Sequence, residues 1–253
     1  MQGPFFIHES IMKTCIIGID CATAHTRTGV AYGECEGTDL RINHVEVRNP
    51  EMVKDMAAAV AKAERVFLAM DAPLGWPALL AKELADHQAG DPLPGKANDL
   101  FRRHTDRFCW KKIGKLPLDV GADRIARTAH AALEILLELR MLTGEPIPLA
   151  WSPDYQEKVC AGEIYPAAVL IKYGLPSSGY KDDKSQKCLD IRRKILDGII
   201  PRLKGAENLE LLVKNADALD AALCLIAGRN FLMGDVCFPD NEELARKEGW
   251  IWL

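Results

Sequence analysis

The sequence predicts an α/β fold built around a buried central strand that ends in a carboxylate. Residues 15–20 form a continuous apolar run, rich in β-branched residues and without a helical stripe, and this run ends at Asp20. Such a pattern is typical of a strand that is buried on both faces of a sheet. A second run of this kind, residues 65–70, follows a helical pattern and ends at Asp71. A helix followed by a buried strand implies a crossover, so we expect this run to lie parallel to a strand from the start of the chain.

Two further strands are expected directly after the first. Residues 28–36 and 40–48 have the composition of strands and are joined by a short turn, so the first three strands are expected to form an antiparallel meander. The apolar alternation of the third strand changes phase in its middle, and we expect a β-bulge near Asn43. Pro50 then begins a helix over residues 51–63 that has an apolar face.

Residues 76–157 are more irregular, and we interpret them as an insertion or cap with helical content. A short helix is expected over residues 77–87, and a stretch rich in proline and glycine follows it. The longest helical pattern of the chain covers residues 122–142 and ends at Gly144. Glycine suits the left-handed conformation that commonly terminates helices.

The last third of the chain continues the alternation of strands and helices. The pattern predicts a fifth strand over residues 159–165, a short helix over 167–173, a helix within 185–203 that breaks near Gly198 or Pro201, a long helix from Asn215 to before Gly234, and a short helix and strand within 242–253. This order extends the α/β architecture to the end of the sequence.

Length and composition favour a single soluble domain. The 253 residues are 48% hydrophobic, and no apolar run approaches the roughly 20 residues that cross a bilayer. We interpret residues 1–13 as an N-terminal extension without the features of a signal peptide, and residues 14–253 as one domain. The eight cysteines lack metal-binding spacing, so we expect reduced, buried thiols in a cytoplasmic protein.

Charge is distributed unevenly along the chain. The net charge of −4 argues against non-specific coating of nucleic acid. Residues 96–115 nevertheless hold seven basic side chains against two acidic ones, and residues 172–194 hold seven against three. A basic middle beside acidic strand ends suits nucleic acid, or another phosphate-rich substrate, presented to a metal ion.

Four aspartates are candidates for one metal site. Asp20 and Asp71 end the two buried strands, and Asp217 and Asp220 lie three residues apart on one face of the last long helix. That face continues through small residues, so the helix is expected to lie close to the sheet with both aspartates near the strand ends. Three or four carboxylates on rigid elements could hold two Mg²⁺ or Mn²⁺ ions for phosphoryl transfer.

Each aspartate also has a purely structural interpretation. Asp217 falls in the first turn of its helix after Asn215, where the helix dipole favours a carboxylate. Asp71 could cap a following helix, and Asp20 could be satisfied by the backbone amides of a turn. Asp220 is harder to explain in this way, because it lies deeper in the helix among alanine and leucine. The four together favour a metal site.

Seven short motifs together resemble the family called domain of unknown function 429, whose members are predicted to be RNase-H-like nucleases. The set extends over nearly the whole chain and is specific, although each motif alone is weak. The motifs are Gly18-Ile19-Asp20, Met70-Asp71-Ala72-Pro73-Leu74-Gly75, Arg102-Arg103-His104-Thr105-Asp106-Arg107, Gly121-Ala122-Asp123-Arg124-Ile125-Ala126-Arg127, Glu163-Ile164-Tyr165-Pro166-Ala167-Ala168, Asp217-Ala218-Leu219-Asp220-Ala221 and Glu248-Gly249-Trp250-Ile251-Trp252.

The resemblance implies an RNase-H-like mixed sheet, with three antiparallel strands followed by parallel strands and helices on both faces. By position, Asp20 resembles the first-strand aspartate of the RNase H superfamily and Asp71 the acid that ends its fourth strand. Asp217 and Asp220 resemble the helical pair of Holliday-junction resolvases. The resemblance therefore implies a nuclease or phosphodiesterase that depends on Mg²⁺ or Mn²⁺. The long segment 76–157 departs from compact members of the superfamily and leaves the substrate open.

Other side chains are candidates for contact with substrate. The arginine-rich motifs supply five candidate phosphate ligands, Arg102, Arg103, Arg107, Arg124 and Arg127, unless these are solvated or paired with local acids. Glu163 is a candidate fifth metal ligand. His25 and His104 are candidates for proton transfer, and Trp76, Trp110 and Trp151 for stacking on bases, although packing explains the tryptophans more simply.

Two other classes of function remain open from the sequence. A small-molecule phosphotransferase of the actin-like kinase superfold would share the first-strand aspartate and the sheet order, but the chain has one copy of the fold and no nucleotide-binding glycine motif. A non-catalytic binding module would use the aspartates as caps and ion pairs. Walker A, G-x-S-x-G and H-E-x-x-H patterns are absent from the sequence.

Overall fold

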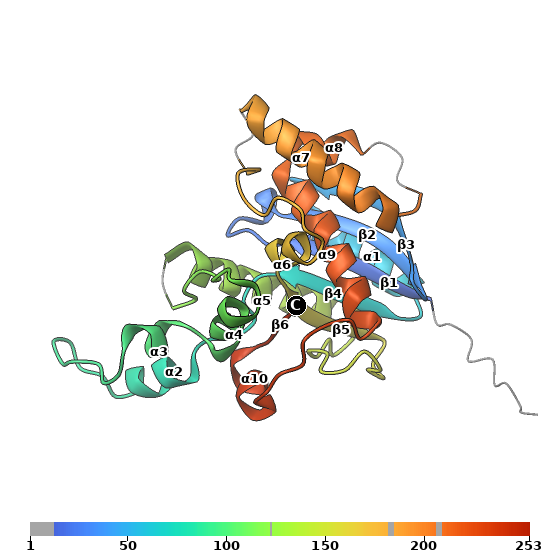
Figure 1. Cartoon of the computed structure of the whole chain (residues 1–253). Helices are drawn as coiled ribbons and strands as arrows, with labels where there is room; N and C mark the ends of the chain where they lie inside the picture. Colours follow the sequence, from blue (N-terminus) through green and yellow to red (C-terminus); the bar gives the residue numbers. More distant parts are fainter. Residues whose placement is uncertain (1–12, 122, 182–184, 206–208) are drawn as a thin grey trace, which may run out of the picture.

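The computed structural model describes residues 13–121, 123–181, 185–205 and 209–253 of the chain. A six-stranded sheet in the order β3-β2-β1-β4-β5-β6 runs through its centre (Figure 1). The strands are β1 (Thr14–Asp20), β2 (Gly29–Glu36), β3 (Asp39–Val47), β4 (Val66–Asp71), β5 (Val159–Ile164) and β6 (Ile251–Trp252). The first three are antiparallel, and β4, β5 and β6 run parallel to β1. The predicted mixed sheet, with three antiparallel strands followed by parallel strands, is confirmed.

The expected bulge in the third strand is present. Tyr32 pairs with His44 while the next residue, Gly33, pairs with Ile42, so Asn43 is the extra residue on β3. One inserted residue exchanges the two faces of a strand, which explains the change of phase in the sequence. The apolar residues on either side of the bulge therefore pack against the same core.

Helices cover both faces of the sheet, as predicted. On one face, α9 (Ala216–Leu232) lies against β1, β2, β3 and β4, and α6 (Pro166–Lys172), α7 (Gln186–Ile199) and α8 (Glu210–Lys214) belong to the same layer. On the other face, α1 (Met52–Lys62) and α5 (Asp123–Thr143) pack against each other and against β1 and β4. Because α9 is enclosed between the sheet and other helices, nearly all of its residues are buried.

Small residues allow α9 to approach the sheet closely. A Cβ atom at Gly18 would lie 2.3 Å from the carbonyl oxygen of Ala221, and one at Gly228 would lie 2.8 Å from Cγ2 of Ile16. Neither position accepts a larger residue without movement of the helix or the strand. The small-residue face expected from the sequence is therefore the face that meets β1, and the same face carries Asp220.

The segment 76–157 is divided between the core and an outlying group of helices. The buried stripe of α5 belongs to the same core as α1. The outlying group contains α2 (Ala78–Leu84) and α3 (Ala97–Phe101), which project to one side of the sheet (Figure 1). Between this group and the sheet, α4 (His104–Ile113) packs against β6 and against α10 (Glu242–Glu248), which also contacts α2. The apolar face of α5 thus packs into the main core of the domain.

Three short helices, α3, α4 and α8, fall where the sequence predicts none. Each has too few apolar repeats for helical periodicity to be visible. Two single turns of 3-10 helix, η1 (His25–Arg27) and η2 (Ile200–Arg202), complete the structure, and η2 lies where the predicted break near Pro201 falls.

Several predictions from composition can be compared with the structure. All eight cysteines are described, none is paired, and six are buried, in agreement with the expected reduced thiols. Among the described helices, none is both long and apolar enough to cross a membrane. The predicted N-terminal extension lies outside the described residues except for Lys13.

Candidate metal centre

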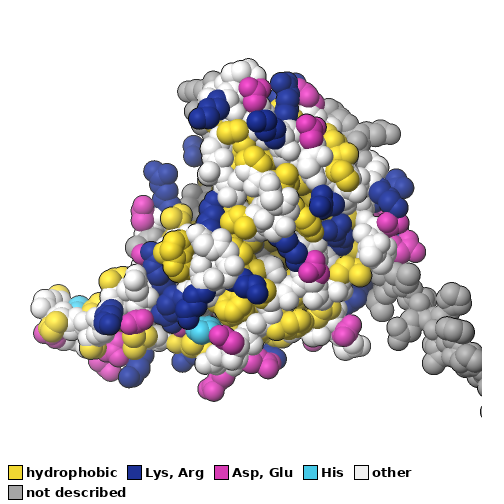
Figure 2. Space-filling view, in the orientation of Figure 1, with side chains coloured by type: hydrophobic (Ala, Val, Ile, Leu, Met, Phe, Trp, Pro, Cys, Tyr) yellow, Lys and Arg dark blue, Asp and Glu magenta, His cyan; other side chains and the backbone are white. Residues whose placement is uncertain are grey.

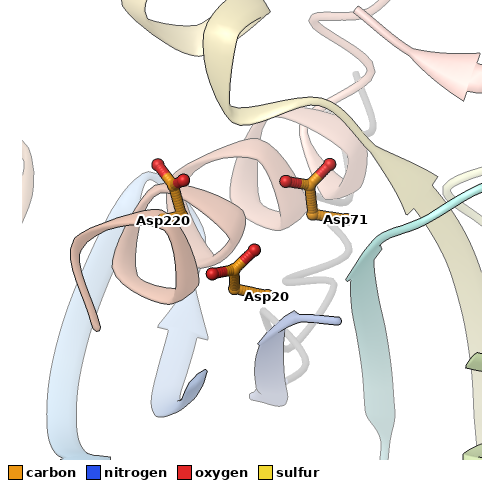
Figure 3. A group of neighbouring side chains, drawn as sticks. All are labelled: Asp20, Asp71 and Asp220. Atoms are coloured by element: carbon orange, nitrogen blue, oxygen red, sulfur yellow. The ribbon is translucent and has the colours of Figure 1, made fainter. Parts of the chain in front are cut away.

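Three aspartates from different elements converge at one edge of the sheet. Asp20 ends β1 and Asp71 ends the neighbouring parallel strand β4, and the two residues are paired in register. Asp220, on α9, lies beside both of them (Figure 3). One ligand oxygen from each carboxylate lies within 4.8 Å of the others. The expected meeting of strand-end and helical carboxylates is therefore present for these three residues.

The pleat of the sheet explains this convergence. Alternate residues of a strand point to the same face. Ile16 and Gly18 face α9, and Asp20 continues their row. On β4, Ala69 also faces α9, and Asp71 continues its row. Both carboxylates consequently emerge on the face that α9 covers, where the helical carboxylate meets them.

Asp217 lies one turn before Asp220 on α9 but outside the group of three. It belongs to the first helical turn, which Asn215 caps by accepting a 2.9 Å hydrogen bond from the N–H of Ala218. Its charge is nevertheless close enough to contribute to raising the pKa of Asp20. A role for Asp217 as a metal ligand stays a prediction.

Asp220 is held by the loop between α6 and α7. Its side chain is fully buried, and its Oδ1 accepts a hydrogen bond of 2.8 Å from the hydroxyl group of Tyr180. Its Oδ2 forms an ion pair of 2.6 Å with Nζ of Lys181. The side chain of Lys181 is 63% exposed, so its ammonium group reaches the carboxylates from the solvent side. A lysine thus offsets part of the negative charge of the centre.

Burial and mutual repulsion perturb these carboxylates. Burial raises the pKa of Asp20 well above its ordinary value, and the charges of Asp220 and Asp71 raise it further, while Lys181 acts in the opposite direction. Burial first, and then the charge of Asp220, raise the pKa of Asp71 to about 7. Carboxylates with raised pKa values gain more from a nearby cation than isolated carboxylates do.

The three carboxylates fit a hard divalent cation. Carboxylate oxygens are preferred ligands of Mg²⁺ and Mn²⁺. Two ligand oxygens around Mg²⁺ lie at most about 4.2 Å apart, since each is about 2.1 Å from the ion. The three carboxylate oxygens lie within 4.8 Å of one another, so small rotations of the side chains would bring them to the distances that one ion requires.

We expect the metal-free protein to lose stability as the pH rises from about 4 to about 7. The ordinary pKa of an aspartate is 3.8 and that of Asp71 in the folded chain is about 7, so in this range the folded chain holds a proton that the unfolded chain has lost. The free energy of unfolding then falls with rising pH, by roughly 2–4 kcal/mol for this group. Urea denaturation in EDTA at several pH values measures the change.

The Asp71→Asn variant isolates this contribution. It should be more stable than the wild type at pH above about 7 and should show a flatter dependence of stability on pH. Asp99→Asn is the matched control, because Asp99 is an exposed aspartate paired with Arg107. Identical pH dependence in the wild type and Asp71→Asn would contradict the raised pKa.

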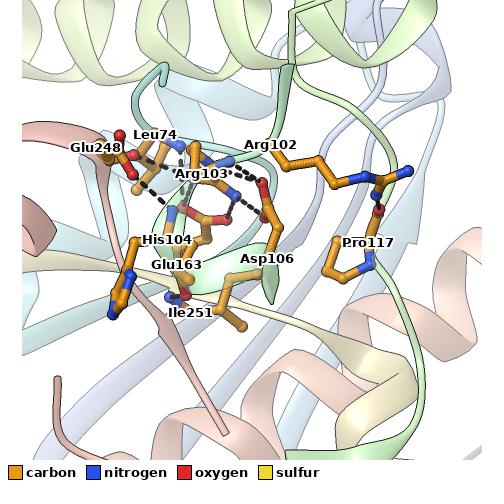
Figure 4. A network of polar contacts seen from close by, with 10 residues as sticks. Leu74, Arg102, Arg103, His104, Asp106, Pro117, Glu163, Glu248 and Ile251 are labelled. Atoms are coloured by element: carbon orange, nitrogen blue, oxygen red, sulfur yellow. Dashed lines mark hydrogen bonds and ion pairs between the residues drawn. The ribbon is translucent and has the colours of Figure 1, made fainter. Parts of the chain in front are cut away.

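Arg103 lies in a buried ion-pair network beside the metal centre (Figure 4). Its guanidinium group donates to both carboxylate oxygens of Glu163, at 2.6 and 2.7 Å, and to Asp106 at 2.9 Å. All three side chains are at most 4% exposed. Arg103 and Glu163 are thus paired with each other, and their expected roles as a phosphate ligand and a metal ligand stay predictions.

Glu248 connects this network to the C-terminal segment. Its carboxylate accepts hydrogen bonds from the backbone N–H groups of Ala78 and His104, at 2.7 and 2.6 Å. These residues begin α2 and α4. The backbone carbonyl of Glu248 also accepts a hydrogen bond of 3.3 Å from Arg103. The first residues of α2 and α4 are therefore hydrogen-bonded to the chain just before β6.

Two of the other candidate phosphate ligands pair with nearby acids. Arg102 forms an ion pair of 2.7 Å with Asp119, and Arg107 one of 3.3 Å with Asp99. Both contacts agree with the alternative interpretation of these arginines, in which they pair with local acids. Lys and Arg side chains still gather over the segment that carries α4, which presents a basic surface (Figure 2).

The remaining candidates lie in other places. Arg124 is exposed near the start of α5, and Arg127 lines a separate groove on that helix. Nε2 of His104 lies 2.5 Å from a carboxylate oxygen of Asp240, and the side chain of His25 lies outside the described part of the chain. The phosphate-binding roles of Arg124 and Arg127 and the proton-transfer roles of His25 and His104 stay predictions.

The three candidate tryptophans differ in exposure. Trp110 is 56% exposed, whereas Trp76 and Trp151 are half-buried. The guanidinium group of Arg246 lies 5.0 Å from the ring centre of Trp151, which agrees with a packing role for that residue.

A cavity of about 310 Å³ opens beside Asp20 and Asp71. Its polar lining also includes Arg103, Thr128, Glu163 and Lys181. Its apolar wall is formed by Pro73, Pro117, Leu118, Ile125, Ile164 and Ile251. Because this wall combines strand ends with residues of the segment 76–157, a ligand in this cavity lies between the sheet and that segment.

A protein-family model described as "Protein of unknown function (DUF429)" matches residues 18–244, which include Asp20, Asp71 and Asp220. The chain belongs to the DUF429 family. No curated protein matches this DUF429 chain. A solved structure of T. thermophilus RuvC in complex with a Holliday junction substrate is similar at 15% sequence identity, over 87% of this chain and 96% of that chain, with a TM-score of 0.32.

Sequence reasoning missed the loop residues of the DUF429 site. Tyr180 and Lys181 lie about forty positions before Asp220, and no spacing motif connects them to it. The sequence shows Lys181 only as one member of the basic segment 172–194. Their contacts arise from tertiary packing of the loop against α9.

Proposed function

We propose that this DUF429 protein is a metal-dependent phosphodiesterase that cleaves nucleic acid. The observation that carries the proposal is the convergence of Asp20, Asp71 and Asp220, within 4.8 Å of one another, beside a cavity. Rigid elements hold all three carboxylates, which is the arrangement that metal-assisted phosphoryl transfer requires. The basic surface over α4 supports a polyanionic substrate.

In this reaction the residues around the cavity would have different roles. A bound Mg²⁺ or Mn²⁺ ion would polarise a phosphoryl oxygen and lower the pKa of a bound water molecule. Asp20, Asp71 and Asp220 would hold the ion, and Tyr180 would orient Asp220 through its 2.8 Å hydrogen bond. Lys181, whose ammonium group reaches the carboxylates from the solvent side, would pair with a phosphate oxygen of the substrate.

Hydrolysis of labelled single-stranded, duplex and branched DNA and RNA tests the proposal. We expect cleavage with Mg²⁺ or Mn²⁺, none with EDTA, and none by Asp20→Asn. Asp39→Asn, at an exposed aspartate paired with Lys204, should cleave like the wild type. A saturating metal ion should also raise the melting temperature by about 5–10 °C, since binding at 100 times Kd adds about 2.7 kcal/mol.

Two results would count against a nuclease. The first is the absence of cleavage of every substrate, or cleavage that Asp20→Asn leaves unchanged. The second is tight binding of ATP without hydrolysis of nucleic acid, which would favour the small-molecule phosphotransferase. A melting temperature that does not respond to Mn²⁺ would favour a non-catalytic binding module.

A further inference from the structure

A second cavity, of about 270 Å³, adjoins the first. The two cavities share Asp71, Tyr165 and Lys181. The second is lined in addition by Lys115 and by the loop residues Ser177 to Tyr180. The three aspartates are therefore bordered by two cavities, and Asp71, Tyr165 and Lys181 form the wall between them.

The second cavity has the chemistry of an anion site. Lys115 comes from the segment after α4, and Lys181 comes from the loop between α6 and α7, so two separate parts of the chain each bring an ammonium group. The ammonium group of Lys115 donates to the backbone carbonyl of Ser177. Burial, and then the positive charge of Lys181, lower the pKa of Lys115. Lys181 is also paired with Asp220 at 2.6 Å, and an anion between Lys115 and Lys181 would offset the remaining repulsion between the two ammonium groups.

The first cavity has a different character. Its apolar wall of proline, leucine and isoleucine suits a flat or hydrophobic group, and its volume of about 310 Å³ lies at the lower end of the roughly 300–1,000 Å³ typical of small-ligand pockets. Leu118 on this wall is 71% exposed. One nucleoside matches these dimensions, whereas stacked base pairs with two backbones do not.

We propose that the two cavities together bind one nucleotide unit of a single-stranded nucleic acid. The nucleoside occupies the apolar-walled cavity, the phosphate on its other side lies between Lys115 and Lys181, and the phosphodiester to be cleaved faces Asp20, Asp71 and Asp220. This inference rests on the proposed nuclease function and adds the substrate class. A strand within a duplex is disfavoured, because its base would first have to unstack and unpair to enter the space between the sheet and the segment 76–157.

The experiment measures binding and cleavage separately with the full chain. Binding of a short fluorescent single-stranded DNA, and of the blunt duplex of the same sequence, is measured by anisotropy in Ca²⁺, and cleavage of both in Mg²⁺. We expect the single strand to bind at least about tenfold more tightly than the duplex. Lys115→Ala should lose about tenfold of single-strand affinity, because a charge-assisted phosphate contact is removed, while Lys115→Arg should keep most of it.

Lys62→Ala is the matched control. Lys62 is an exposed lysine in the last turn of α1 that lines neither cavity and lies outside the basic surface over α4, so its removal should change the affinity less than about twofold. Melting temperatures of all the variants establish that they fold. Equal losses in Lys62→Ala and Lys115→Ala would show general electrostatic attraction and overturn the phosphate site.

The outcomes separate this inference from the proposed function. Metal-dependent cleavage with equal binding of single strand and duplex would keep the nuclease and overturn the single-strand site. Preferential, Lys115-dependent binding of the single strand without any cleavage would keep the site and overturn the nuclease. Absence of binding to both DNAs would overturn the site as well.

Discussion

Replacing Arg103 with alanine is expected to reduce the free energy of unfolding by about 3–5 kcal/mol. Glu163 and Asp106 are 4% and 0% exposed and receive the hydrogen bonds of this guanidinium group. Removing the guanidinium would leave two carboxylates buried without their cation, and an unpaired buried charge costs far more than the net contribution of an exposed ion pair. Urea denaturation at neutral pH, with the wild type beside the variant, measures the loss.

Arg102→Ala is the control for that experiment. Arg102 is the preceding residue and also pairs with an aspartate, Asp119, but that carboxylate is 40% exposed. We therefore expect a loss of no more than about 1 kcal/mol. Similar losses in the two variants would mean that the buried network contributes little, and a phosphate-binding role for Arg103 would then regain support.

The strand ends of this fold could be predicted from the sequence because their signals are local. The apolar runs before Asp20 and Asp71 each carry the composition of a buried strand, and the helix before the second run implies that it lies parallel to one of the first three strands. The structure pairs it with β1, and parallel neighbours bring their carboxyl ends to one edge of the sheet, so these two carboxylates meet. Helical periodicity placed Asp220 on the small-residue face of α9 for an equally local reason.

The ion pair between Arg103 and Glu163 could not be predicted, because these two residues are distant in the sequence. Arg103 stands among other basic residues, where a solvated or phosphate-binding side chain is the simplest interpretation. Glu163 is 60 residues away and is the last residue but one of β5. Burial of this pair depends on how α4 and the chain before β6 pack together, and no pattern in either segment alone reports that packing.

The sequence could not distinguish Asp220, which joins the group of three carboxylates, from Asp217, which does not, because the difference depends on the fold. Both lie on α9 and share a face at helical spacing, so periodicity treats them alike. The approach of α9 to the sheet makes the difference, since a Cβ atom at Gly29 would lie 2.4 Å from the backbone carbonyl of Asp217. The start of the helix is therefore pressed against β2, while Asp220 faces the ends of β1 and β4.

Replacing Asp220 with asparagine is accordingly expected to lower the rate of metal-dependent hydrolysis by at least about 10³-fold, and Asp217→Asn by no more than about 10- to 100-fold. Asp220 belongs to the group whose oxygens lie within 4.8 Å of one another, and Asp217 does not. Loss of a direct ligand removes a metal bond, whereas loss of an outlying charge weakens the field around the site.

Mn²⁺ binding, measured by calorimetry, is the second readout, and it does not depend on knowing the natural substrate. We expect Asp220→Asn to weaken Mn²⁺ binding more than Asp217→Asn by at least about tenfold. Both changes remove one negative charge from the same face of α9, so a general effect of charge would weaken binding equally in the two variants. Equal losses would therefore contradict a distinct role for Asp220, since either a general effect of charge or a metal bond to both helical aspartates would produce them.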